Sequence, residues 1–124
     1  MIVFASSPLA GVKMREASVI IPDCDNVGVS LAKVHDMFRA RLMDHFGGFT
    51  AVAVIGGFCG DNGTRYIEPG VEYRIAADWT PELDYKLSLA CSVIAREGNQ
   101  ESVYLKLATG EVHFIEAPLK AEVA

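Results

Sequence analysis

The sequence has no apolar run close to the roughly 20 residues that a membrane-spanning helix requires. Its N-terminus also lacks the basic region and the length of a secretion signal. Yet 51% of its 124 residues are hydrophobic and its mean hydropathy is +0.25, high values for a small monomeric protein. We therefore predict a cytoplasmic protein without membrane association, whose surplus apolar surface is covered in a homo-oligomer, most simply a homodimer.

Basic residues are few, 11 against 16 acidic ones, which gives a formal net charge of −5. They are scattered and form no stripe that would follow a phosphate backbone, so nucleic-acid binding is disfavoured. The 3 cysteines are odd in number, widely spaced and without a C-x-x-C motif. This usage is typical of reduced thiols in a cytosolic protein and excludes a disulfide framework.

No motif for a metal or a cofactor is present. His35 and His45 stand ten residues apart at the edges of one predicted helix face, and His113 alternates with apolar residues in a predicted strand, where it could face the open side of the predicted sheet. None has a ligand partner at zinc-binding spacing. The glycines of residues 56–60 enter a predicted hairpin, whereas phosphate-binding loops lead into a helix N-terminus. We predict no bound metal and no cofactor.

The order of the hydrophobic periodicities predicts the fold. Residues 17–116 form a single predicted domain, preceded by an N-terminal strand or flexible leader (1–16) and followed by a C-terminal tail (117–124). The order is β-α-β-β-α-β plus one terminal strand, the split βαβ plan of ferredoxin-like α/β sandwiches, an α+β fold. It places two helices on one face of an antiparallel sheet and leaves the other face open. The predicted elements are a strand over 17–21, a helix over 31–46, a hairpin over 49–77, a helix over 80–97 and a hairpin over 102–115.

Local signals set the element boundaries. Ser30 is a candidate cap of the first helix, and Thr80 followed by Pro81 opens the second. Asn62-Gly63 suits the positive φ angles of a type I′ hairpin turn. Pro69-Gly70 interrupts the returning strand and predicts a bulge or a sheet edge. The apolar stripes of the two helices comprise Leu31, Val34, Phe38, Leu42 and Phe46, and Leu83, Leu87, Ala90, Cys91 and Ile94.

Strand alternation indicates which residues the open face presents. In the returning strand Ile67, Val71, Tyr73 and Ile75 are expected on the core side. If the register continues through Pro69-Gly70, the opposite side carries mixed polar and aromatic residues. This face either packs against a second copy or lines a shallow pocket for a small molecule or a protein ligand. Its predicted members are Tyr66, Glu68, Glu72 and Arg74, with Tyr104 and Lys106 from a neighbouring strand.

Two groups of polar residues have a chemical and a plain interpretation. Glu68 and Glu72 could form a general acid/base pair if burial or mutual proximity raised the pKa of one of them. The plain alternative, which we favour, is two exposed strand carboxylates, one of them paired with Arg74 or Lys106. Gln100 and Glu101 could satisfy backbone groups in a tight connection, or they could join a polar rim near the Asn-Gly turn.

Three segments together resemble a group of small uncharacterised bacterial and phage proteins. They are D-H-F-G-G-F-T over 44–50, Gly57 with D-N-G over 61–63 followed by Glu68, and G-N-Q-E-S-V-Y over 98–104. The resemblance implies the split βαβ plan over nearly the whole domain and a cytosolic setting. It implies no activity. Its polar members are Glu68, Gln100 and Glu101.

The sequence leads to one functional prediction and one alternative. The prediction is a small cytosolic, non-enzymatic module that self-associates and binds a ligand or protein through the open sheet face. The alternative is a cofactor-independent enzyme acting on a small polar or aromatic substrate in a dimeric α+β barrel-like pocket. In that enzyme Glu68 or Glu72 would act as base and Arg74 would hold an anion. Tyr66 or Tyr104 would supply a hydroxyl.

Overall fold

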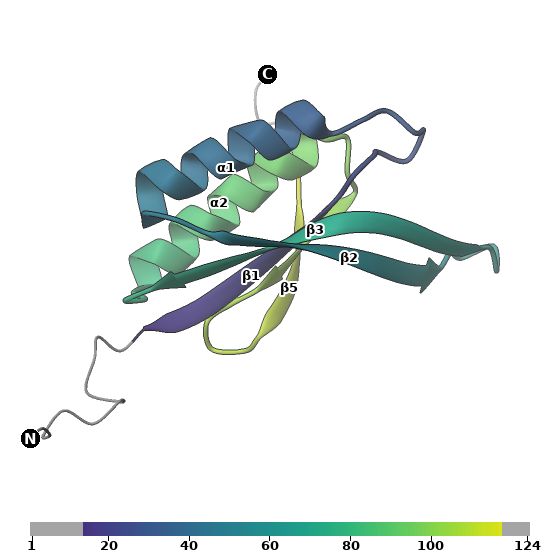
Figure 1. Cartoon of the computed structure of the whole chain (residues 1–124). Helices are drawn as coiled ribbons and strands as arrows, with labels where there is room; N and C mark the ends of the chain where they lie inside the picture. The colour runs from purple at the N-terminus through teal and green to yellow at the C-terminus, as the bar shows by residue number, and fades with distance from the viewer. Residues whose placement is uncertain (1–13, 118–124) are drawn as a thin grey trace, which may run out of the picture.

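The computed structural model describes residues 14–117, so most of the predicted N-terminal leader and all but one residue of the predicted tail lie outside the described residues. Five strands and two helices follow one another in the order β-α-β-β-α-β-β (Figure 1). They are β1 (Arg15–Pro22), α1 (Ala32–Phe46), β2 (Thr50–Cys59), β3 (Arg65–Ala77), α2 (Pro81–Glu97), β4 (Ser102–Lys106) and β5 (Val112–Glu116).

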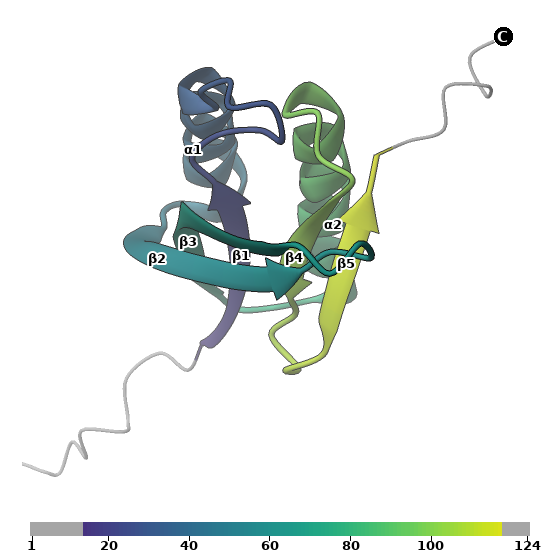
Figure 2. The ribbon, with the colours of Figure 1, turned by 90° about the vertical axis from the view of Figure 1, so that its right-hand side faces the viewer.

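The strands form one antiparallel sheet in the order β2-β3-β1-β4-β5. Both helices lie side by side on one face of this sheet, and the other face is open (Figure 1, Figure 2). The predicted α+β class and split βαβ plan are thereby confirmed, with β5 added beside β4. Within residues 14–117, β2 and β5 are the two edge strands.

The core lies between the helices and the three inner strands. Val19 of β1 and Ile75 of β3 are fully buried, as are Phe38 of α1 and Leu87 of α2. Phe38 meets the ring of Tyr73 edge-on, with ring centroids 5.2 Å apart. The predicted stripes of both helices face this core, with Phe46 and Leu83 only half-buried at their ends.

The helix ends follow the expected capping chemistry with one difference. Thr80 caps α2, its hydroxyl accepting from the N–H of Leu83 at 3.3 Å, and Pro81 occupies the first turn. The predicted cap at Ser30 is displaced by one residue, because Leu31 is the N-cap of α1. The Ser30 hydroxyl still accepts from the N–H of Ala32 at 3.2 Å, so it satisfies one donor of the first turn.

The β2–β3 turn differs from the predicted type I′ geometry. Gly63 has φ +82°, whereas Asn62 is not among the residues with positive φ. The N–H of Gly63 donates to the carbonyl of Gly60 at 2.9 Å, and the N–H of Gly60 donates to the carbonyl of Thr64 at 2.7 Å. This is a type I turn followed by a left-handed glycine, the other common solution for a hairpin.

Pro69-Gly70 does not bulge. Pairing between β2 and β3 runs without interruption from Thr50–Arg74 to Cys59–Arg65, so the register continues through this dipeptide. Gly70 lies opposite Pro22, where a Cβ would come within 2.8 Å of the Ile21 carbonyl oxygen. The predicted alternative, a sheet edge, is correct, because β1 ends here and the rest of β3 has β2 as its one described neighbour.

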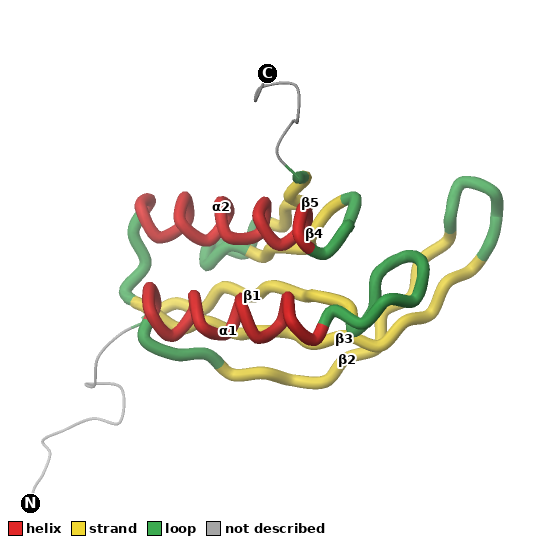
Figure 3. The backbone as a smooth tube through the Cα atoms, turned by 90° about the horizontal axis from the view of Figure 1, so that it is seen from above, coloured by secondary structure: helices red, strands yellow, loops and turns green. Residues whose placement is uncertain are grey.

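Beyond this point the β2–β3 hairpin continues as an arm, which we define as residues 55–69. The arm projects past the ends of both helices (Figure 1, Figure 3). Ile67 was predicted in the core, but it is 79% exposed, and Ile55 is 78% exposed. Ile67 points to the core side of the sheet, yet no helix reaches far enough to cover it. Across residues 14–117, none of the helices has the length and apolar character needed to cross a bilayer.

Candidate functional site

The open face of the sheet gathers four of the predicted site residues on its inner strands. Glu72 and Arg74 of β3 form an ion pair, in which Nη2 of Arg74 lies 3.0 Å from Oε1 of Glu72 and Nε donates to the same oxygen at 3.1 Å. Glu72 stands between Ile20 and Val52 on the neighbouring strands. The carboxylate of Glu72 is therefore held by an arginine rather than paired with Glu68.

Tyr104 and Lys106 of β4 complete this group. Tyr104 lies opposite Ile20 and meets the exposed ring of Phe114 edge-on, with centroids 5.9 Å apart. Lys106 lies on the other side of Ser18 from Arg74, so two cations flank one buried serine. The face thus combines an apolar strip with one carboxylate and two cations.

The remaining predicted residues lie elsewhere. Tyr66 belongs to the arm, where its ring stacks on Phe58 with centroids 4.8 Å apart. Glu68 is half-buried on the same strand, opposite Gly56. Gln100 lies in the α2–β4 connection, and its amide donates to the carbonyl of Gly98 at 2.9 Å. Glu101 is exposed in the same connection.

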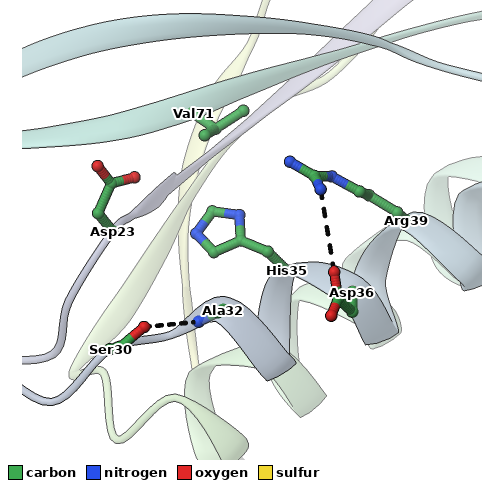
Figure 4. Close-up of a pocket in the computed structure, with 7 residues that line it drawn as sticks. All are labelled: Asp23, Ser30, Ala32, His35, Asp36, Arg39 and Val71. Atoms are coloured by element: carbon green, nitrogen blue, oxygen red, sulfur yellow. Dashed lines mark hydrogen bonds and ion pairs between the residues drawn. The ribbon is translucent and has the colours of Figure 1, made fainter.

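A cavity of about 260 Å³ opens on the helix side of the sheet, and sequence reasoning missed it. It lies where β1 ends, between the first turns of α1 and strand β3 (Figure 4). Asp23 follows Pro22 at this point, and its N–H donates to the carbonyl of Pro69 at 3.0 Å. The lining residues are Asp23, Ser30, Ala32, His35, Asp36, Arg39 and Val71.

His35 forms the base of this cavity and is 6% exposed. Its Nε2 lies 2.9 Å from the carbonyl oxygen of Pro22, and its Nδ1 lies 2.5 Å from the hydroxyl oxygen of Tyr73. A carbonyl oxygen only accepts, so Nε2 carries the hydrogen. In the neutral ring Nδ1 then accepts from the Tyr73 hydroxyl. The clue in the sequence was Tyr73 itself, because a buried tyrosine hydroxyl needs a partner.

Arg39 borders the cavity one turn further along α1. Its guanidinium carbon lies 5.7 Å from the centre of the Tyr73 ring. Its nearest carboxylate, Asp36, is 3.9 Å away, and within the described residues its Nε is buried without a hydrogen-bond partner. Burial raises the pKa of Tyr73, and the positive charge of Arg39 acts in the opposite direction. The tyrosine therefore stays neutral beside the cation.

Thiol and metal chemistry find no support in the described part of the chain. Burial raises the pKa of Cys91 to about 12, which keeps this thiol protonated, while Cys24 and Cys59 are exposed and unbridged. Residues 14–117 contain no group of three or more His, Cys, Asp or Glu placed to hold a metal ion. His113 lies opposite Leu105, which puts it on the helix side of the sheet and not, as anticipated, on the open side.

The architecture places the chain in the class of ferredoxin-like α/β sandwiches. Within that class it is similar to two solved structures of one enzyme. The first is a phage SAM lyase in complex with S-methyl-5′-thioadenosine, with TM-score 0.67 and 18% identity over 86% of this chain and 92% of that chain. The second is a phage SAM lyase in the apo state, with TM-score 0.63 and 19% identity over 84% and 90% of the two chains.

Sequence comparison adds nothing to this. No protein-family model matches the chain, and the search of curated proteins found no match. The signature shared with small bacterial and phage proteins thus stays a prediction.

The similarity corrects the main functional prediction. We expected a non-enzymatic module because the sheet face is open and the sequence has no catalytic motif. Both solved structures that share this fold along most of the chain are of an enzyme, a phage SAM lyase. The prediction was wrong because a fold of this kind occurs in proteins with many unrelated activities. An open sheet face therefore does not indicate that a protein only binds its ligand. The two matched structures agree better with the alternative, an enzyme acting on a small molecule.

Proposed function

We propose that this chain is a lyase that cleaves S-adenosylmethionine (SAM) and releases S-methyl-5′-thioadenosine. The observation that carries the proposal is the agreement in fold over 86% of this chain and 92% of a phage SAM lyase that holds S-methyl-5′-thioadenosine.

The reaction needs no cofactor. The bond between the sulfonium sulfur and the γ-carbon of the methionine part breaks, and the sulfur keeps the electron pair and becomes the neutral thioether of the nucleoside product. The four-carbon fragment then follows one of two balanced routes. Either its β-carbon loses a proton to a base and an alkene forms, or its own carboxylate attacks the γ-carbon and closes a lactone. Neither route consumes water.

The change in charge at the sulfur during the reaction indicates what surroundings the protein must provide. A positive charge at sulfur disappears as the bond breaks, so apolar surroundings favour the reaction by weakening solvation of the reactant cation. The open face supplies an apolar strip at Ile20, Val52 and Tyr104. The arm supplies Glu68, which is half-buried.

Glu68 is the carboxylate that we assign to the reacting end of the substrate. Glu72 is less suited, because Arg74 already holds its carboxylate. In the alkene route Glu68 is the base that accepts the proton. In the lactone route the substrate's own carboxylate is the nucleophile, and Glu68 binds the positively charged sulfonium end of the substrate. The identity of the four-carbon product therefore assigns the role of this residue.

The test is incubation of the purified chain with SAM, followed by liquid chromatography and mass spectrometry. We expect S-methyl-5′-thioadenosine together with either the alkene or the lactone. Glu68→Gln should lower kcat/KM by about 10²-fold or more, the usual scale for loss of a catalytic carboxylate. The matched control is Glu82→Gln on the exposed face of α2, where Glu82 pairs with Lys86 at 3.2 Å, and it should keep full activity.

Two results would contradict the proposal. Intact SAM after prolonged incubation with folded protein would refute the lyase. Full activity of Glu68→Gln would leave the lyase but remove Glu68 from its site.

The exposed apolar residues of the arm and of the open face indicate that the chain associates with a second copy of itself. The arm exposes Ile55 and Ile67, and the open face exposes Phe114 at 66%, so apolar surface is available for a second copy. We propose a homodimer, and native mass spectrometry at several concentrations tests it. A monomer at all concentrations, or an assembly with another number of subunits, would contradict the dimer.

A further inference from the structure

The arm leaves the rest of the sheet at one defined place, Pro69 and Gly70 of β3, which we call the root of the arm. There Pro22, the last residue of β1, lies opposite Gly70, and the two backbones leave no room for a Cβ. The N–H of Asp23 then donates to the carbonyl of Pro69 at 3.0 Å. Within residues 14–117 this is the last hydrogen bond that β3 receives from the β1 side as it enters the arm.

The root of the arm carries the candidate carboxylate. Glu68 directly precedes Pro69, and a residue before a proline is confined to extended conformations. The proline ring in turn fixes the φ angle of Pro69. The backbone between Glu68 and the Pro69 carbonyl therefore has little freedom. A displacement of that carbonyl consequently displaces Glu68 as well.

His35 of α1 holds the segment that supports this root. Its Nε2–H donates to the carbonyl of Pro22 at 2.9 Å, and its Nδ1 accepts from the hydroxyl of Tyr73 at 2.5 Å. The two partners belong to β1 and β3, so one buried imidazole joins both strands from the helix side. The first residue before α1 adds a further bond, because the N–H of Leu31 donates to the carbonyl of Asp23 at 2.9 Å.

The cavity beside His35 makes these hydrogen bonds the main restraint on the segment. Both Asp23 and His35 line this space of about 260 Å³ (Figure 4). Close packing of side chains is what usually holds a backbone segment in place. Here one side of the segment borders the cavity, so the end of β1 has room to shift when the bond to His35 is removed.

We propose that His35 is a positioning residue, whose hydrogen bond to the Pro22 carbonyl holds the root of the arm and thereby the Glu68 carboxylate on the open face. His35 lies on the helix side of the sheet and Glu68 points to the open side, so the effect passes through the backbone of β1 and β3. The use of this position in catalysis rests on the proposed lyase function, whereas the restraint on the arm does not.

Two substitutions at position 35 distinguish the roles of the two ring nitrogens. Glutamine places an amide N–H near the position of Nε2, so His35→Gln keeps a donor for the Pro22 carbonyl. Asparagine is one methylene shorter, and its amide reaches only the position of Nδ1 beside Tyr73. His35→Asn therefore loses the bond to Pro22. Ile94→Val, in the buried core of α2 and away from the arm, is the control for a general loss of stability.

The first readout is a double-mutant cycle with Glu68→Gln. We expect His35→Asn alone to lower kcat/KM for SAM by about tenfold or more, because a small misplacement of a catalytic group is costly. In the Glu68→Gln background it should change kcat/KM by less than about twofold, because a residue that acts through Glu68 has nothing left to position. His35→Gln should stay within about threefold of the unmodified chain and Ile94→Val within about twofold.

The second readout needs no substrate. Hydrogen exchange of the Asp23 amide, followed by nuclear magnetic resonance, reports how often its bond to the Pro69 carbonyl opens. Relative to the amide of Leu105 in the inner strand β4, we expect the Asp23 amide to exchange about tenfold faster in His35→Asn than in His35→Gln. Urea unfolding of each variant confirms that it is folded.

The outcomes separate this inference from the proposed function. No loss of activity in His35→Asn, equal losses in His35→Asn and His35→Gln, or equal losses in both Glu68 backgrounds would overturn the inference and leave the lyase. If the unmodified chain leaves SAM intact, the lyase proposal fails and the exchange of the Asp23 amide decides. Faster exchange in His35→Asn then supports the inference, and unchanged exchange overturns it. If His35→Asn does not fold, Tyr73→Phe, which removes the partner of Nδ1, replaces it in both measurements under the same criteria.

Discussion

The two halves of β3 have the same alternation of side chains and opposite surroundings. In the inner half Tyr73 and Ile75 are fully buried beneath the helices, whereas in the arm Ile67, on the same side of the strand, is 79% exposed. Alternation determines the side of the sheet to which a residue points. How far the helices extend decides whether that side is covered, and this depends on the tertiary arrangement of the whole chain.

The largest expected difference between the two regions concerns apolar side chains. Phe38→Ala should lower the free energy of unfolding by about 3–5 kcal/mol, because it leaves a cavity against Tyr73. Ile67→Ala in the arm should change it by less than about 0.5 kcal/mol, as exposed positions do. Urea unfolding followed by circular dichroism measures both values. Similar losses for the two variants would show that the arm is covered in solution.

The buried thiol of Cys91 and the exposed thiol of Cys59 should affect stability differently at alkaline pH. Burial raises the pKa of Cys91 from 9.0 to about 12, so between these values the unfolded chain loses a proton that the folded chain keeps. Stability should therefore fall as the pH rises through this window, with a contribution of up to about 1.4 kcal/mol per pH unit. Cys91→Ala should flatten the pH profile of unfolding free energy, and Cys59→Ala in the arm should not. Parallel profiles for Cys91→Ala and the unmodified chain would contradict a buried, protonated thiol.

A third contrast uses two tyrosine hydroxyls. Tyr73→Phe leaves Nδ1 of the buried His35 without its partner and should destabilise the fold by about 1–3 kcal/mol. Tyr66→Phe removes a hydroxyl from a ring that is 42% exposed and stacked in the arm, and we expect no measurable change. Thermal unfolding of the two variants at one pH is sufficient. An unaffected Tyr73→Phe would mean that His35 has another partner in solution.

The last contrast compares two glycines. Gly63 at the tip of the arm has φ +82° and open space around it, so Gly63→Ala should cost only the backbone strain, about 1 kcal/mol. Gly70→Ala should cost about 1–3 kcal/mol, since its Cβ would meet backbone atoms of β1 at 2.8 Å. Unfolding midpoints for both variants test this order. The reverse order would indicate that β1 can move away from β3.

Much of the fold could be predicted because its signals are local. The stripes that include Phe38 in α1 and Leu87 in α2 each have helical spacing, and Thr80-Pro81 marks a helix start whatever surrounds it. The continuous strand register through Pro69-Gly70 was harder to predict from the sequence. Whether a proline is tolerated there depends on where the neighbouring strand β1 ends, and β1 lies far away in the sequence.

The cavity could not be predicted for a related reason. Asp23, His35 and Arg39 show no motif, and each is ordinary in its own segment. They meet because the end of β1 turns back under the start of α1 and beside β3. The open-face residues were found by alternation alone, yet the pairing of Glu72 with Arg74 was one of several options until the structure showed it.

The free edge of β2 has a consequence for handling the protein. Residues 50–55 contain no charge and no proline, they have high β propensity, and within the described chain their outer backbone edge pairs with no other strand. Such an edge is a template for ribbon-to-ribbon association and for amyloid-type stacking. We therefore expect this edge to be the place where two copies of the chain first associate during aggregation. We expect aggregation to increase when the protein is concentrated or heated.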